Sequence, residues 1–291
     1  MPDPNFFHVD VFATRPLTGN GLAVFVHTEG WSATAMQRIT QEMKQFESIF
    51  LSEVSAAGAR ARVFTGEEEL PFAGHPVLGA AAVLHRSLAP ATAHCSWVMR
   101  LAAGDIAVTT DKLGEHHRAE MNQGMAVFGE AIAPADLQPI LARLGLQAHD
   151  LLPGVPPQVV STGLPYLILP VRPEALARAA INGPDLEALL GVVGAKFVLV
   201  LDVAGREIRT WDNLGKVEDV ATGSAAGPTA AYLFALGLAD PRQALELVQG
   251  RFAGRPSRLT ARQDAQGCVL VSGEVWPVLH GSFDLAQITN D

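Results

Sequence analysis

Three side chains in this sequence have the types and settings that proton transfer requires: Glu47, His75 and Asp219. Glu47 stands where an amphipathic helix is expected to give way to a strand, in the apolar stretch 46–50, and partial desolvation suits a carboxylate to general-base work. His75 lies in a glycine turn at the mouth of a helix, which favours a neutral imidazole. If these groups face one another, the two carboxylates can divide into a base and an acid, an arrangement suited to isomerisation.

Each residue also has a simpler interpretation. Glu47 would then be a solvated residue at a helix end, His75 a capping residue, and Asp219 an acidic residue that complements a helix dipole. The sequence alone leaves both interpretations open.

The turn that carries His75 returns in altered form near residue 223. The stretch 69–84 matches 218–233 with a constant shift of 149 positions (223 − 74), and each copy leads from an acidic residue through a glycine turn into an Ala-rich helix. Backbone N–H groups at a helix start can hold an anion, so two facing copies would bind a small carboxylate. The residues expected to line this site are Gly74, Gly223, Ser224 and Ala225, with Ser224 also expected to cap the second helix. A chance match of two Ala-rich helices is the alternative.

The motifs of several other chemistries are missing from the sequence. It contains no phosphate-binding loop, no Gly-x-Ser-x-Gly elbow, and no His-Glu-x-x-His or paired Cys-x-x-Cys metal motif. The adjacent His116 and His117 are interpreted as a polar turn. We therefore expect neither a metal nor a cofactor.

The composition indicates a compact globular protein. Of the 291 residues, 48% are hydrophobic and 18% are charged, and a net charge of −9 disfavours nucleic acid or an anionic membrane as a partner. Cys95 and Cys268 are expected to be buried, reduced thiols, which fits a cytoplasmic location. The N-terminus lacks the pattern of a signal peptide, and no apolar run is long enough to span a bilayer.

Short strands outnumber helices along the chain, which predicts an α+β fold. Strands are expected at 6–12, 22–26, 49–51, 60–65, 95–101 and 105–110, and at seven further places between 158 and 271. A helix capped by Ser32 or Thr34 is expected to carry the apolar residues of 36–46. Further helices are expected over 134–144, 173–180 and 184–190, besides the two Ala-rich ones. We expect two halves, 1–126 with Glu47 and the first glycine turn and 127–291 with the second turn. In an alternative arrangement the last residues return to the first half.

Six stretches of the sequence together resemble a known family. They are Val9-Asp10-Val11-Phe12 with Gly19-Asn20, 36–50, Leu70-Pro71-Phe72-Ala73-Gly74-His75-Pro76, 161–167, 218–227, and Gly254-Arg255-Pro256-Ser257. On these motifs the chain is similar to the PhzF-like phenazine-biosynthesis family, which shares the diaminopimelate epimerase-type fold. The resemblance implies two pseudo-symmetric halves, each a curled, mostly antiparallel sheet around a central helix. It also implies a homodimer.

The resemblance further implies a cofactor-free 1,3-type proton shift on a dihydro-hydroxyanthranilate, with Glu47 as the base and His75 and Asp219 in support. Gly74 and Ser224 match the positions of paired cysteines in related epimerases. Because this chain has no cysteine there, two-base racemisation is not expected. The leading hypothesis is an isomerase of a small cyclic or unsaturated carboxylate. The alternative is a non-catalytic binding or regulatory protein with the same fold.

Overall fold

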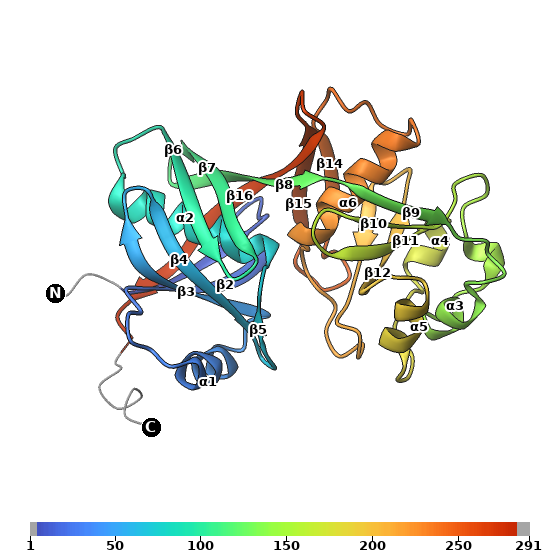
Figure 1. Ribbon diagram of the computed structural model, residues 1–291, viewed down its shortest axis with the longest axis horizontal. Helices are drawn as coiled ribbons and strands as arrows, with labels where there is room; N and C mark the ends of the chain where they lie inside the picture. Colours follow the sequence, from blue (N-terminus) through green and yellow to red (C-terminus); the bar gives the residue numbers. More distant parts are fainter. Residues whose placement is uncertain (1–4, 284–291) are drawn as a thin grey trace. The chain divides into compact units, whose positions relative to one another are not determined.

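The computed structural model describes residues 5–283. The chain forms two compact units. Unit 1 comprises residues up to Asn122 together with the segment from Ser272 onward, and unit 2 comprises Gln123–Val271. Figure 1 labels the elements of both. Two strands, β8 and β16, carry the chain across this division, so the last strand of the chain ends in unit 1.

Unit 1 is a sheet whose strand order, β1-β2-β3-β4-β6-β7-β8-β16, closes on itself because β16 also pairs with β1. Most of these pairings are antiparallel, while β2 with β3 and β4 with β6 are parallel. The strands are β1 (Phe6–Val11), β2 (Asn20–Val26), β3 (Glu47–Ser55), β4 (Gly58–Thr65), β5 (Glu69–Leu70, beside β4), β6 (His94–Leu101), β7 (Gly104–Leu113), β8 (His116–Met125) and β16 (Cys268–Gly281).

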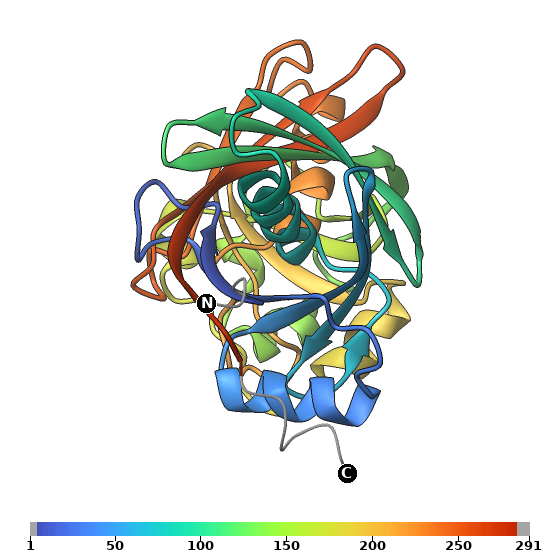
Figure 2. The same ribbon diagram turned by 90° about the vertical axis from the view of Figure 1, so that its left-hand side faces the viewer.

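Helix α2 (Gly74–Leu88) fills the interior of unit 1. Figure 2 looks along this helix, with the strands of the unit arranged around it. All residues from Gly74 to His85 are buried, which explains why the segment is rich in alanine and glycine. A Cβ atom at Gly79 would lie 2.5 Å from the Leu22 side chain and 3.0 Å from that of Val11, so β1 and β2 approach this position too closely for a larger residue.

A second helix, α1 (Ala33–Met43), packs on the outside of unit 1. Ser32 accepts a hydrogen bond from the N–H of Ala35 and caps its N-terminus. Its buried residues Met36 and Ile39 lie in a cluster with aromatic side chains, in which the rings of Phe25 and Phe50 stack at 4.9 Å. This cluster fixes β3, and with it the strand end that carries Glu47.

Unit 2 has the strand order β15-β14-β13-β12-β11-β10-β9, with β15 next to β16. Again most pairings are antiparallel, and β11 with β12 and β13 with β14 are parallel. The strands are β9 (Val127–Ala131), β10 (Gln158–Ser161), β11 (Pro165–Val171), β12 (Phe197–Asp202), β13 (Glu207–Arg209), β14 (Leu245–Gln249) and β15 (Ser257–Gln263).

Helix α6 (Gly223–Ala235) is the central helix of unit 2 and packs against β10, β11 and β15. A Cβ atom at Gly227 would collide with the Gln123 and Thr162 side chains, so this helix too needs a glycine where its neighbours come close. The short helices α3 (Gln138–Arg143), α4 (Pro173–Leu176) and α5 (Leu186–Val192) and a 3₁₀ turn (Ala148–Asp150) complete the unit. Leucines of α3 and α5 pack with β11 and β12 in one apolar cluster.

The two units repeat one pattern of pairing. In unit 1 the successive strands are β1, β2, β3, β4, β6 and β7. The pairings between neighbours in this series are, in order, antiparallel, parallel, antiparallel, parallel and antiparallel. In unit 2, β10 to β15 pair in the same succession, and each central helix follows the fourth strand of its series, with the two-residue β5 intervening in unit 1. The fold is therefore α+β with two pseudo-symmetric halves, as expected.

Three of the expected helices differ from the observed ones. The segment 134–144 is helical only over α3, 173–180 only over α4, and the helix expected over 184–190 is α5, which lies two residues later. Helix α1 begins after Ser32, one of the two expected caps, but it ends three residues before Phe46, where Lys44 adopts a φ of 53°. Proline positions near these segments mark a helix start only approximately, because the N-terminal turn also depends on the loop that precedes it.

Candidate active site

Glu47 is the first residue of β3. Its backbone pairs with Leu22 of β2 on one side and with Thr65 of β4 on the other. The side chain is buried, with 7% of the residue exposed. A carboxylate at the start of an interior strand is held by the sheet and partly removed from water, which suits proton transfer.

His75 belongs to the first turn of α2 and is 4% exposed. Its Nδ1 lies 3.3 Å from Oε2 of Glu47 and 3.5 Å from Nδ2 of the buried Asn20 at the start of β2. Burial lowers the pKa of His75 to about 3, so the imidazole is neutral near neutral pH. The contact with Glu47 is thus one between a carboxyl group and a neutral ring rather than an ion pair.

Two groups meet His75 at Nδ1, and they call for different tautomers of the neutral ring. Nδ1–H can donate to the Glu47 carboxylate, whereas an unprotonated Nδ1 accepts from the Asn20 amide nitrogen, which can only donate. The other ring nitrogen, Nε2, is buried and has no hydrogen-bond partner among residues 5–283. A buried nitrogen without a partner next to a buried carboxylate marks a place where a ligand could supply the missing hydrogen bond.

The start of α2 carries no side-chain cap. Its N-cap residue is Ala73, which offers no side-chain oxygen to the first-turn N–H groups. Such uncapped groups are suited to hold an anion. Gly74 and His75 are therefore placed where a carboxylate could meet backbone N–H groups.

Asp219 in unit 2 is held by a network of buried side chains. Thr222 Oγ1 donates to Asp219 Oδ2 at 2.5 Å, and the N–H of Ala221 donates to Oδ1 at 3.3 Å. Gln249 on β14 donates through Nε2 to Thr222 Oγ1 at 2.9 Å and to the Asp219 carbonyl at 2.8 Å, and it accepts from the Thr222 N–H at 2.9 Å. Because Gln249 donates to the Thr222 oxygen, the Thr222 hydrogen is directed to Asp219.

Ser224 does not cap α6, contrary to the expectation. The N-cap residue is Thr222, whose side chain makes no cap hydrogen bond because its hydroxyl serves Asp219. Ser224 lies in the first turn, where its hydroxyl is 2.8 Å from that of Tyr166. Because the Thr222 hydroxyl bonds to Asp219 and not to a first-turn N–H, the start of α6 has no side-chain cap, like that of α2.

An aromatic pair stands beside Ser224. Tyr166, on β11, stacks on Phe197, the first residue of β12, with ring centroids 5.4 Å apart. The repeat places Phe197 where unit 1 has Glu47. Each is the first residue of the third strand in its series, and that strand pairs parallel with the second strand. Unit 1 thus carries an acid–base pair at this position, and unit 2 carries aromatic rings and a hydroxyl.

The structure groups the expected site residues by unit. It brings Glu47, Gly74 and His75 together in unit 1. In unit 2 it bonds Asp219 to Ala221 and Thr222, which directly precede the expected Gly223, Ser224 and Ala225 in the chain. Their joint action on one ligand stays a prediction.

Sequence reasoning missed four residues of these groups: Asn20, Tyr166, Thr222 and Gln249. Asn20 and Thr222 stand beside turns that the sequence predicts, so their positions next to these turns could have identified them as site residues. Gln249 lies 30 residues from Asp219 in sequence, and nothing local indicates their contact.

The two cysteines lie away from the glycine turns. Cys95 is on β6 and Cys268 on β16, both free and only half-buried, so the expectation of buried thiols was wrong in degree. Each lies at or next to the first residue of its strand rather than in the core that its apolar neighbours indicated. Within residues 5–283 no group of three or more metal-ligating side chains occurs. No helix in the same range has the length and hydropathy needed to cross a membrane.

Comparison with known proteins agrees with this architecture. The family model PhzC-PhzF, described as phenazine biosynthesis-like protein, matches residues 9–281. The chain is 34% identical over 264 residues to the trans-2,3-dihydro-3-hydroxyanthranilate isomerase of Pseudomonas aeruginosa, covering 89% of this chain and 90% of that protein. It is 30% identical to the uncharacterized isomerase YddE of Escherichia coli K12, with 79% of each covered. A solved Pseudomonas aeruginosa structure described as a predicted epimerase shares 50% identity and a TM-score of 0.91, covering 97% of this chain and 99% of that one.

Proposed function

The chain belongs to the PhzC-PhzF family and is an isomerase, and from this premise we propose that it moves a proton between carbons of a small cyclic or unsaturated carboxylate without a cofactor. The proposed reaction is similar to that named for its relative, trans-2,3-dihydro-3-hydroxyanthranilate isomerase. The observation that carries the proposal is the buried Glu47 carboxylate, 3.3 Å from a neutral imidazole at an uncapped helix start.

In the proposed reaction Glu47 takes a proton from one carbon of the substrate and becomes a carboxylic acid. It then returns the proton to the carbon two positions away, while the double bond between them shifts, so no atom is gained or lost. His75 stays neutral, with Nδ1 3.3 Å from Oε2 of Glu47, and keeps the carboxyl group oriented while that group alone carries the substrate proton.

The remaining residues are proposed to bind the substrate. Backbone N–H groups at the two uncapped helix starts, with Gly74 in one and Gly223, Ser224 and Ala225 in the other, would hold the substrate carboxylate. Asp219 would act as the partner acid or base. The stacked Tyr166 and Phe197 support a planar ring in the substrate, since ring faces favour flat unsaturated ligands. A homodimer in the cytoplasm is part of the same proposal.

The test is proton exchange with solvent. The wild-type protein is incubated in heavy water with trans-2,3-dihydro-3-hydroxyanthranilate, and deuterium entering carbon-bound positions is followed by NMR. Glu47→Gln is expected to keep the fold and to lower turnover by about 10²-fold or more, the usual scale of general acid–base catalysis. Glu42→Gln, an exposed change on α1, is the matched control and should retain activity.

Two outcomes would contradict the proposal. Unchanged deuterium uptake in Glu47→Gln would remove Glu47 from the reaction. Binding of the compound by the wild type without isomerisation or exchange would favour a non-catalytic binding protein on the same fold.

A further inference from the structure

Unit 1 contains a pocket of about 390 Å³ that includes neither Glu47 nor His75. It opens where the parallel strands β4 and β6 part. They pair only from Gly58–Arg60 to Val98–Arg100, and β4 pairs next with β5, through Val63 and Phe64. Between these two stretches, Ala61 and Arg62 have no pairing with β5 or β6 in the described residues. The pocket lies at this interruption of the sheet.

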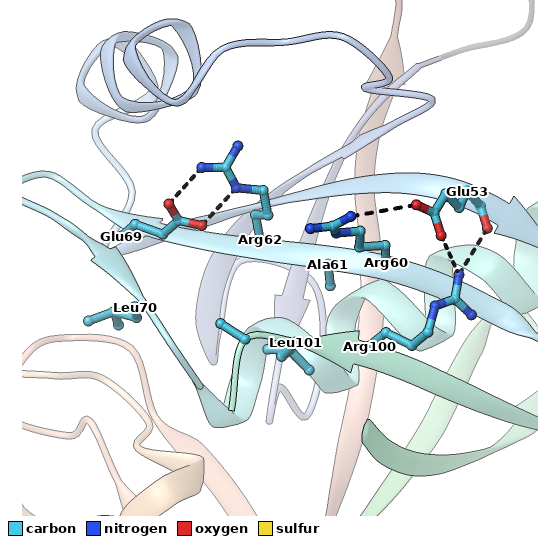
Figure 3. Close-up of a pocket in the computed structure, with 9 residues that line it drawn as sticks. Glu53, Arg60, Ala61, Arg62, Glu69, Leu70, Arg100 and Leu101 are labelled. Atoms are coloured by element: carbon cyan, nitrogen blue, oxygen red, sulfur yellow. Dashed lines mark hydrogen bonds and ion pairs between the residues drawn. The ribbon is translucent and has the colours of Figure 1, made fainter. Parts of the chain in front are cut away.

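Three arginines surround the pocket, as Figure 3 shows. Arg60 and Arg62 project from β4, and Arg100 comes from β6. Ala61, Leu70 and Leu101 add apolar surface. The site therefore combines guanidinium groups with an apolar wall, the combination that binds organic anions.

The charges in the pocket do not balance. Glu69 forms a two-bond pair with Arg62, at 2.7 and 2.6 Å. Glu53 serves two arginines: it accepts from Arg100 at 3.2 Å and lies 3.7 Å from Arg60. Three guanidinium groups thus face two carboxylates, which leaves one positive charge on a chain whose net charge is −9.

Among the three arginines of the pocket, Arg60 has the N–H groups that are most available to a ligand. Its contact with Glu53 is longer than a hydrogen bond, and its side chain is 63% exposed. Arg62 and Arg100 also retain N–H groups beyond those bonded to the glutamates, because a guanidinium carries five. A planar oxyanion can accept several of these donors at once.

We propose that this pocket is a second ligand site, which binds a small organic monocarboxylate. The single surplus charge matches one carboxylate better than a doubly charged phosphate, and the apolar wall matches a hydrocarbon ring or chain. The inference does not depend on the proposed isomerisation, because the pocket shares no residue with the Glu47 and His75 pair.

The test uses benzoate as the probe and follows the arginine Nε–H signals by NMR, with Kd measured by titration calorimetry. Benzoate is expected to shift the signals of Arg60, Arg62 and Arg100 saturably. Benzamide, which has the same ring without the charge, and inorganic phosphate should bind more weakly. Arg60→Gln and Arg100→Gln should each raise the benzoate Kd about fivefold or more, the scale of a lost charge-assisted hydrogen bond. Arg118→Gln, an exposed change on β8, is the matched control and should leave the Kd unchanged.

The proposal is overturned if benzoate causes no saturable shift of the three arginine signals, or if Arg60→Gln and Arg100→Gln bind it as the wild type does. Benzamide binding as tightly as benzoate would contradict carboxylate recognition, and phosphate binding as tightly would contradict the role of the apolar wall. The Glu47→Gln variant separates this site from the proposed active site. It should lose deuterium exchange and keep the arginine shifts.

Discussion

Nδ1 of His75 lies 3.3 Å from Oε2 of Glu47, and burial keeps the imidazole neutral beside the carboxylate. A neutral imidazole next to a carboxylate differs from a charged imidazole in its effect on the ionised form of the carboxylate. It does not hold the carboxylate in the ionised form by charge, so Glu47 remains able to take up a proton during a reaction cycle. This property suits the pair to the reversible proton transfer that we propose for it.

The first prediction concerns the charge of His75. Because burial lowers its pKa to about 3, His75 should show the ¹⁵N and ¹H shifts of a neutral ring throughout the range from pH 8 to pH 5. Two-dimensional NMR of the ring nitrogens measures this, with the exposed His27 as an internal reference. Titration of His75 near pH 6.5 would contradict the burial argument, and it would make the contact with Glu47 an ion pair.

The second prediction concerns the hydroxyl between Gln249 and Asp219. Thr222→Val keeps the shape of the side chain but removes the donor to Asp219 and the acceptor for Gln249. We expect the free energy of unfolding to fall by about 1–3 kcal/mol, because buried polar groups lose their partners, and turnover to fall by about tenfold or more.

Thr222→Ser restores the hydroxyl and serves as its control. Urea unfolding and the deuterium-exchange assay measure the two effects separately. If Thr222→Val turned over as fast as Thr222→Ser while losing stability, the network would be structural only, and Asp219 would need no orientation by Thr222.

The internal repeat explains why much of the fold could be predicted from the sequence. The shift of 149 positions relates the two central helices, and their small residues follow from burial inside a sheet. Arg62 and Arg209 also occupy matching places, and each pairs with the glutamate that precedes its glycine turn, Glu69 or Glu218. These features are local in sequence, so pattern reasoning can find them.

The remaining parts depend on long-range contacts. Gln249 reaches Asp219 from another strand, and Asn20 meets His75 across 55 residues. The pocket between β4 and β6 depends on where two parallel strands stop pairing, which the sequence of neither strand specifies. The short helices of unit 2 lie within or overlap the expected segments, but their ends differ because these depend on packing against the sheet.

The third prediction compares the contributions to stability of the two ion pairs in matching positions of the repeat, Arg209–Glu218 and Arg62–Glu69. Arg209 is 6% exposed, forms two bonds to Glu218, and donates to the carbonyls of Leu176 and Ala179 at 2.7 and 2.8 Å. Arg62 has the same pairing, but its side chain is 30% exposed. Arg209→Gln should lower the free energy of unfolding by about 3–5 kcal/mol, because it leaves a buried carboxylate and buried carbonyls without partners.

Arg62→Gln should lower the same quantity by at most about 1 kcal/mol, because solvent screens the exposed pair. Guanidinium unfolding curves of both variants make the comparison. Equal losses in the two variants would show that burial does not determine the contribution of this repeated pair.

The fourth prediction concerns acid sensitivity. Burial, with nearby positive charge from His85 and Arg86, lowers the pKa of His117 to about 4, below its ordinary value of 6.5. As the pH falls from about 6.5 to about 4, the unfolded chain binds a proton at this site and the folded chain does not. The free energy of unfolding therefore decreases by about 1.4 kcal/mol per pH unit for this group, and below about pH 4 it decreases no further on its account.

Urea unfolding at pH 7 and pH 5 tests this for the wild type and for His117→Gln. The wild type should lose about 2 kcal/mol more between the two pH values than the variant, because the variant has no proton to take up at this position. His27→Asn, at an exposed position whose φ of 59° asparagine tolerates, is the control and should behave as the wild type does. An identical loss in His117→Gln and the wild type would mean that His117 is protonated as readily in the folded protein as in the unfolded chain, and the acid sensitivity would then have to come from other groups such as His75.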